Sequence, residues 1–176
     1  MFKRRLKPAA TCENKMVIKE RKHRLLKEFY RGEISAGFTL CLRGDVVASI
    51  KPEIINIFTD ILNSVVSKAG CIIPVYCFMP DHQHLIITGT QDDSDIWKAI
   101  VSYKQKTGFW MSVNKLGVRW QKDYYDHVIR TREDIASQVR YILDNPVRKG
   151  LVSSWQEYPF KGSIGCKMED ILNGII

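Results

Sequence analysis

The chain has 176 residues, of which 45% are apolar, so we expect one domain with an extension or two and exclude a disordered protein. No apolar run is long enough to cross a bilayer, and no apolar stretch follows the charged start, so we expect no signal peptide. The net charge is +8, with eleven basic and four acidic side chains in residues 1–33, and eleven and five in residues 98–149. Such clusters suit a polyanion such as nucleic acid, although a solvated basic face would look the same.

The hydrophobic pattern predicts alternating strands and helices behind a basic arm. Residues 1–34 form the arm, in which Leu25, Leu26, Phe29 and Tyr30 recur at roughly helical spacing. After the arm, β-branched and aromatic runs predict strands, and apolar stripes bounded by Pro or Gly predict helices. In chain order these are a strand at 35–42, a helix from Pro52 to Gly70, strands at 71–79 and 82–88, a helix at 96–113, a strand at 124–129 and a last helix after Thr131.

The order of these elements predicts an α+β fold. The first six match a ferredoxin-like βαββαβ antiparallel sheet with helices on one face, and the C-terminal helix is added to it. Pro74 inside the second strand indicates an edge position or a bulge. Thr131 and Asp134 resemble a capping box at the start of the last helix, and Pro146 predicts that this helix ends at Asn145.

Two of the four histidines form the sequence His82-Gln83-His84 at the start of the third strand. Side chains alternate between the faces of a strand, so His82 and His84 should point the same way and could chelate a divalent metal. Two structural histidines would give the same pattern, which is weak by itself. The adjacent break at Pro80 would leave the metal open to a large substrate, which suits catalysis better than a closed structural site.

The last helix carries a second candidate group. Tyr141 and Asn145 are four residues apart and therefore share one helix face, beside the apolar stripe that can pack on the sheet. A tyrosine oxygen can attack a phosphodiester that a metal polarises, although ordinary packing is the simpler role for a tyrosine on a helix. His127 on the fourth strand could contact a phosphate or assist proton transfer, or could be structural.

Three motifs, in order, resemble those of HUH single-tyrosine transposases. Residues 79–87 (MPDHQHLII) are similar to their histidine motif, and residues 141–152 (YILDNPVRKGLV) to the tyrosine helix of their REP-associated relatives. The linking segment 120–130 (WQKDYYDHVIR) also resembles that subfamily, and the whole match spans about residues 35–160. The sequence departs at Gln83, where the family usually has a hydrophobic residue. Because Gln83 should lie on the opposite strand face, it should leave the two histidines in place.

This resemblance implies a ferredoxin-like fold and a metal-dependent endonuclease and strand transferase that acts on single-stranded DNA hairpins. It implies that His82, His84 and Asn145 bind Mg²⁺ or Mn²⁺, and that Tyr141 becomes joined to a 5′-phosphate and leaves a free 3′-hydroxyl. It also implies a single-tyrosine transposase (HUH) domain at 35–160, between the arm at 1–34 and a C-terminal tail at 161–176.

We expect the partner to be single-stranded DNA with hairpins, and we expect no membrane partner. The protein is expected to be a monomer or a homodimer and to lie in the cytoplasm, at the nucleoid. Aromatic side chains interleave with basic ones after residue 103, and such surfaces bind unpaired bases and phosphates. Two other functions stay open, namely a hairpin-binding protein without cleavage and a metal-dependent phosphoesterase that uses water. The basic candidates for DNA contact are Lys104, Lys106, Lys122, Arg130, Arg132, Arg148 and Lys149.

Overall fold

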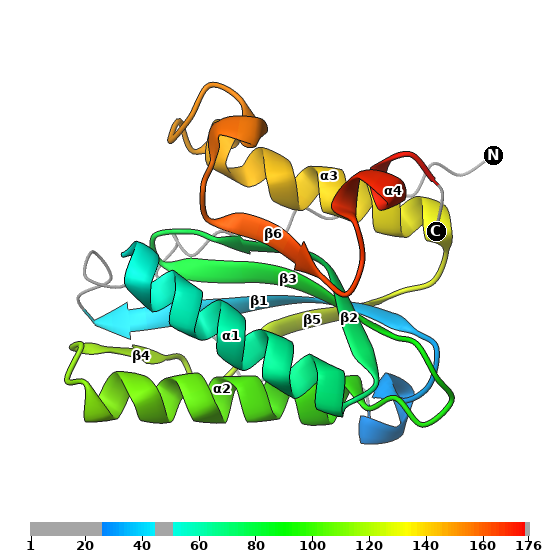
Figure 1. Ribbon diagram of the computed structural model, residues 1–176, viewed down its shortest axis with the longest axis horizontal. Helices are drawn as coiled ribbons and strands as arrows, with labels where there is room; N and C mark the ends of the chain where they lie inside the picture. Colours follow the sequence, from blue (N-terminus) through cyan, green and yellow to red (C-terminus); the bar gives the residue numbers. More distant parts are fainter. Residues whose placement is uncertain (1–25, 45–50, 175–176) are drawn as a thin grey trace.

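The computed structural model describes residues 26–44 and 51–174, apart from the side chains of residues 132 and 133. These residues form one antiparallel sheet with helices packed on it (Figure 1). In chain order the elements are η1 (Lys27–Tyr30), β1 (Ser35–Gly44), α1 (Pro52–Lys68), β2 (Cys71–Phe78), β3 (His82–Gly89), α2 (Ile96–Val113), β4 (Val118–Trp120), β5 (Tyr125–Ile129), α3 (Arg132–Arg148), η3 (Trp155–Glu157), β6 (Lys161–Ile164) and α4 (Met168–Leu172).

Five of the six strands follow the order β4-β1-β3-β2-β6, and the sixth, β5, pairs with β1. β4 and β5 share one edge of β1, since β4 pairs with Leu42–Gly44 and β5 with Ser35–Thr39. Every pairing is antiparallel. The structure therefore confirms the predicted α+β class with an antiparallel sheet.

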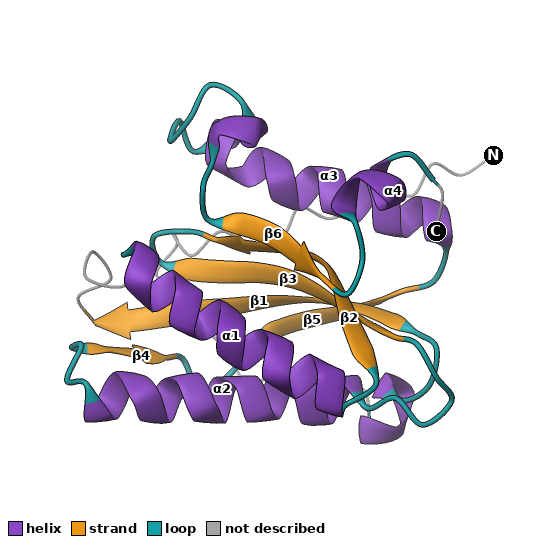
Figure 2. Cartoon of the chain, viewed as in Figure 1, coloured by secondary structure: helices purple, strands orange, loops and turns teal. Residues whose placement is uncertain are grey.

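The helices cover both faces of the sheet, with α1 and α2 on one face and α3 and α4 on the other (Figure 2). Alternation along each strand supplies an apolar surface to both faces. On β3, Leu85 and Ile87 belong to the cluster under α1 and α2, whereas Ile86 packs with Ile142 and Leu143 of α3. His82 and His84 follow the alternation of Ile86, so their side chains lie on the α3 face.

Pro74 marks a bulge, as one of the two predictions for it required. The register of β2 against β3 shifts between Ile72 and Val75. Pro74, which has no N–H to donate, therefore lies outside the regular pairing of the two strands. The alternative, an edge position, is wrong because β6 pairs with the outer side of β2.

The prediction that the last helix ends at Asn145 is wrong, because α3 continues through Pro146 to Arg148. A proline lacks the N–H that would bond to the carbonyl four residues earlier, here that of Ile142. The Asn145 side-chain amide takes over this task, since its Nδ2 lies 3.4 Å from the Ile142 oxygen and 2.9 Å from the Tyr141 oxygen. The start of α3 agrees with the sequence, because Thr131 Oγ1 accepts from the N–H of Asp134.

The ends of the chain add to the sheet and its core. The described part of the predicted arm forms one short 3₁₀ helix, and its Tyr30 is buried in the cluster under α1 and α2. After the tyrosine helix, β6 extends the sheet beyond β2, and α4 packs through Met168 and Ile171 on the α3 face. Among the described residues, none of the helices has the length and hydropathy needed to cross a bilayer.

Candidate metal centre and tyrosine helix

The two histidines of β3 converge, as the strand alternation predicted. His82 and His84 are 2% and 3% exposed, their Nε2 atoms lie 2.9 Å apart, and their ring centroids are 4.6 Å apart. β1 is their neighbour in the sheet, with Cys41 opposite His82 and Thr39 opposite His84. The two Nε2 atoms therefore lie next to each other on the face that α3 covers.

Each imidazole is held by a partner at its other nitrogen. Asp81 Oδ1 lies 2.5 Å from Nδ1 of His82, and Thr39 Oγ1 lies 2.9 Å from Nδ1 of His84. Partners of this kind at Nδ1 orient histidines that bind metals through Nε2. The hydrogen bond to His82 lowers the pKa of Asp81, which keeps this carboxylate charged.

Electrostatics also favour the neutral form of His84. Burial lowers its pKa to about 3, and the neighbouring His82 acts in the same direction. Its imidazole is therefore neutral at physiological pH, and the neutral ring is the form that binds a metal.

The spacing of the two nitrogens fits one octahedral cation. Two bonds of about 2.1 Å that meet at about 90° hold their nitrogens about 3.0 Å apart, close to the 2.9 Å between the Nε2 atoms. Within the described part of the chain, no cluster of three or more His, Cys, Asp or Glu side chains could hold a metal. A cation here would therefore need further ligands of another kind, such as an amide oxygen, water or phosphate.

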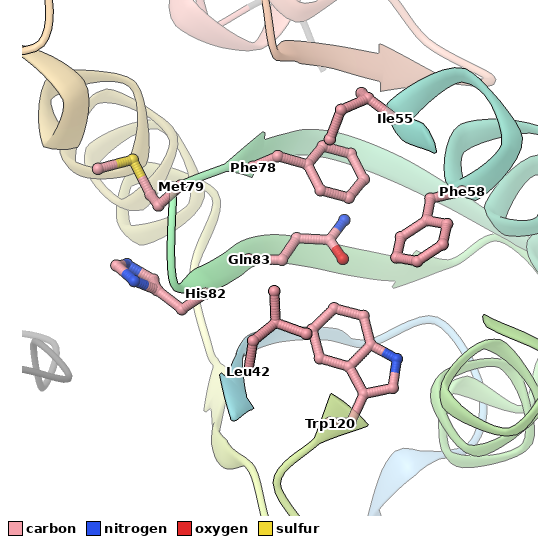
Figure 3. A pocket seen from close by; sticks show the side chains of 8 residues that line it. All are labelled: Leu42, Ile55, Phe58, Phe78, Met79, His82, Gln83 and Trp120. Carbon is pink, nitrogen blue, oxygen red and sulfur yellow. The ribbon is translucent and has the colours of Figure 1, made fainter. Parts of the chain in front are cut away.

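Gln83, between the two histidines, points to the opposite face of the sheet. Its side chain is buried, and Tyr103 of α2 donates to its Oε1 over 2.8 Å. Its Nε2 is buried and has no hydrogen-bond partner among the described residues. Gln83 lines a pocket with room for about one water molecule (Figure 3). The other residues that line this pocket are Leu42, Ile55, Phe58, Phe78, Met79, His82 and Trp120.

The tyrosine helix α3 lies on the same face as the histidine pair. Tyr141 is half-buried against the core of this face, and Asn145 is 4% exposed. Asn145 Nδ2 donates to the carbonyls of Tyr141 and Ile142. Its Oδ1, the atom that a cation would bind, is not used in these two hydrogen bonds. The charge of Lys149, which follows α3, helps to lower the pKa of Asp81, the carboxylate bonded to His82.

His127 also lies on this face. It pairs with Gly37 of β1, two residues from the Thr39 that bonds to His84. A Cβ built on Gly37 would be 2.5 Å from Cε1 of His127, so the exposed imidazole rests directly on the glycine backbone. The fold thus brings His127 to the histidine face, at the side where β5 joins the sheet.

The basic candidates for DNA contact separate into groups. Arg148 and Lys149 lie at the end of α3, on the face of the sheet that bears the histidine pair. Lys104 and Lys106 lie on α2, across the sheet, and Nζ of Lys104 donates to the carbonyls of Gln121 and Lys122. The side chains of Lys122 and Arg130 are exposed on either side of β5, and that of Arg132 lies outside the described residues.

Sequence patterns missed the two residues that hold the imidazoles. Asp81 directly precedes His82, so its place in the histidine motif was a usable signal. Thr39 lies 45 positions from His84, and its role depends on the register of β1 against β3. The residue pattern of β1 itself gives no sign of such a partner.

The sequence matches the family model Transposase IS200 like over residues 43–145. A protein named as a REP-associated tyrosine transposase in Haemophilus influenzae is 27% identical over 149 residues, covering 74% of this chain and 82% of that protein. The REP-associated tyrosine transposase of Escherichia coli is 33% identical over 93 residues, covering 50% and 52% of the two chains. A solved REP-associated tyrosine transposase bound to a REP hairpin has the same fold, with a TM-score of 0.67 and 23% identity over 80% of this chain and 81% of that one. Because the family model spans more than half of the sequence, the chain belongs to the IS200-like transposases, a family of DNA-binding tyrosine transposases.

Proposed function

We propose that the chain is a metal-dependent endonuclease and strand transferase that cuts hairpin-containing single-stranded DNA through a phosphotyrosine at Tyr141. The observation that carries this proposal is the convergence of the His82 and His84 Nε2 atoms, each held by a partner, on the face that bears α3. The REP hairpin bound to the similar solved transposase supports the choice of substrate. The proposal includes a ferredoxin-like fold for the sheet, with the tyrosine helix α3 on the face opposite α1 and α2.

The metal ligands in this proposal are His82, His84 and Oδ1 of Asn145, and the cation is Mg²⁺ or Mn²⁺. A bound cation would withdraw charge from the scissile phosphate. Asp81 and Thr39 keep both imidazoles turned toward the shared point, so the site is organised before DNA arrives. The Asn145 amide nitrogen also donates to the carbonyls of Tyr141 and Ile142, and these bonds hold its Oδ1 in a fixed position on α3.

The reaction transfers a phosphate to the tyrosine. The Tyr141 oxygen loses its proton and bonds to phosphorus, the bond from phosphorus to the 3′ oxygen breaks, and that oxygen takes a proton to become a free 3′-hydroxyl. The DNA stays attached through a 5′-phosphotyrosine until a 3′-hydroxyl or water displaces the tyrosine. His127, on the same face, would contact a phosphate or assist proton transfer.

The surface around the site would bind the DNA through its cations. Arg148 and Lys149 would contact phosphates next to the cleaved bond, and Lys122, Arg130 and Arg132 would bind the strand near β5. Lys106 and Lys104 lie on the α2 side, so they would contact DNA that wraps around the sheet edge. A protein of this kind would act as a monomer or a homodimer on DNA in the cytoplasm.

The experiment is incubation of the full chain with a pool of single-stranded hairpins and Mn²⁺, followed by denaturing gels and peptide mapping. We expect a covalent adduct on the peptide that contains residues 141–148. Tyr141→Phe keeps the ring and its packing, so it should fold and bind hairpins normally and form no adduct. His82→Ala should bind Mn²⁺ weakly and should not cut.

Tyr125→Phe is the matched control, because Tyr125 pairs with Thr39 on the histidine face and is the other half-buried tyrosine there. It should cut normally. Tyr103 is fully buried and donates to Gln83, so an adduct on it is not expected. Cleavage by Tyr141→Phe would contradict the nucleophile, and full activity in excess chelator would contradict the metal. Binding without any cleavage would favour a hairpin-binding protein, and cleavage without an adduct a phosphoesterase that uses water.

A further inference from the structure

Arg148 lies on the ring of the proposed nucleophile. Its Cζ is 5.0 Å from the centroid of the Tyr141 ring. The two residues are seven apart on α3, close to two full turns, so they share one side of the helix. The helix reaches Arg148 because Asn145 compensates for Pro146. The contact therefore depends on the last turn of α3, which the sequence pattern did not predict.

The chemistry of the two groups indicates a role for this contact. A guanidinium is flat and stays charged, so it can stack on an aromatic ring and still present N–H groups at its edge to a phosphate. Arg148 is exposed, whereas Tyr141 is half-buried against the core under α3. One face of the tyrosine ring is thus held by the protein and another is covered by a cation that an incoming phosphate can reach.

We propose that Arg148 is a positioning residue for strand cleavage. Its guanidinium holds the Tyr141 ring in one orientation and donates hydrogen bonds to a non-bridging oxygen of the phosphate that Tyr141 attacks. This inference rests on the proposed function, and it assigns Arg148 a part in the orientation of the attack beyond simple affinity for DNA.

The test is single-turnover cleavage of a hairpin at saturating protein with Mn²⁺, together with the Kd for the same hairpin. Arg148→Ala should slow cleavage by about tenfold or more, since small misplacements of a reacting group are costly, and should change the Kd by no more than about threefold, since one phosphate contact is lost. Arg148→Lys keeps the charge but loses the flat stack, so it should recover little of the rate. Arg119→Ala removes an exposed arginine on β4 and should match the wild type in both measurements.

A second measurement needs no DNA. Nitration of Tyr141, followed by peptide mapping, should be faster in Arg148→Ala than in the wild type, because the guanidinium no longer covers the ring. Arg119→Ala should leave this rate unchanged. Equal nitration in all three proteins would show that Arg148 does not shield the ring in solution and would overturn the proposal.

Three cleavage results would also overturn it. These are wild-type cleavage by Arg148→Ala, full recovery by Arg148→Lys, and a loss that lies entirely in the Kd, which would make Arg148 an ordinary phosphate contact. Tyr141→Phe in the same assay separates this inference from the proposed function. If Tyr141→Phe still cuts, the proposed function fails. If Tyr141→Phe is inactive while Arg148→Ala cuts normally, only the role of Arg148 fails.

Discussion

The buried pair of Gln83 and Tyr103 predicts a strong coupling between two substitutions. Tyr103 donates to Gln83 Oε1 over 2.8 Å, both side chains are at most 1% exposed, and Gln83 Nε2 has no partner among the described residues. Tyr103→Phe removes the donor and leaves the whole Gln83 amide buried without a protein partner. Gln83→Leu removes the acceptor and leaves the Tyr103 hydroxyl unpaired. The double substitution leaves no polar atom of the pair behind.

The expected sizes follow from the cost of a buried unpaired group. Tyr103→Phe should lower the free energy of unfolding by about 1–3 kcal/mol, because an acceptor loses its donor. Gln83→Leu should cost less, since it also removes the unpaired Nε2. Replacement of both partners by apolar groups is nearly neutral or stabilising, so the double variant should lie within about 1 kcal/mol of the wild type. If the double variant matches the wild type, the coupling energy equals the sum of the two single losses, about 1 kcal/mol or more, which is well above the deviation of about 0.3–0.5 kcal/mol for independent sites.

Urea unfolding followed by circular dichroism measures these free energies, with an unchanged m-value as the check that all four proteins unfold alike. In a chain of this size, 1 kcal/mol corresponds to about 2–4 °C in Tm. Mn²⁺ affinity should be the same in all four proteins, because His82 and His84 point to the other face of the sheet. Additive effects of the two substitutions would refute the buried hydrogen bond, and a loss of Mn²⁺ binding in the double variant would show that Gln83 supports the histidines.

Three further outcomes are expected. Thr39→Val keeps the side-chain shape but removes the hydrogen bond to His84, so Mn²⁺ affinity measured by calorimetry should fall by about tenfold, and unchanged affinity would show that Thr39 does not orient the ring. Deletion of residues 1–25, which hold nine Lys or Arg and two Glu, should weaken DNA binding and flatten its dependence on salt; an equal slope would mean that this segment does not touch DNA. Gly37→Ala places a Cβ against the exposed His127 ring, which must turn away from β1, so unfolding in urea should show a loss of about 0.5–1.5 kcal/mol from the displaced rotamer, whereas wild-type stability would show that the ring moves aside freely.

The sequence alone predicted the long elements and the candidate residues, because both depend on local spacing. The helix at 96–113 has the predicted bounds, and the strand that starts at His82 differs from its prediction by one residue at its end. The two-residue repeat of a strand was enough to place His82 and His84 on one face and Gln83 on the other. Three motifs in order were enough to indicate the transposase family.

Tertiary structure decided what those residues contact. The short edge strands β4 and β6 carry too few residues for a clear alternation, and they form because β1 and β2 offer unpaired edges. Thr39 reaches His84 only through the register of two strands, and Tyr103 meets Gln83 only where α2 crosses the sheet. Helix α3 continues past Pro146, where the Asn145 side-chain amide bonds to the Ile142 carbonyl that the proline leaves without its N–H donor. Hydrogen bonds between residues distant in sequence leave no periodic signal, so the packed fold alone could reveal them.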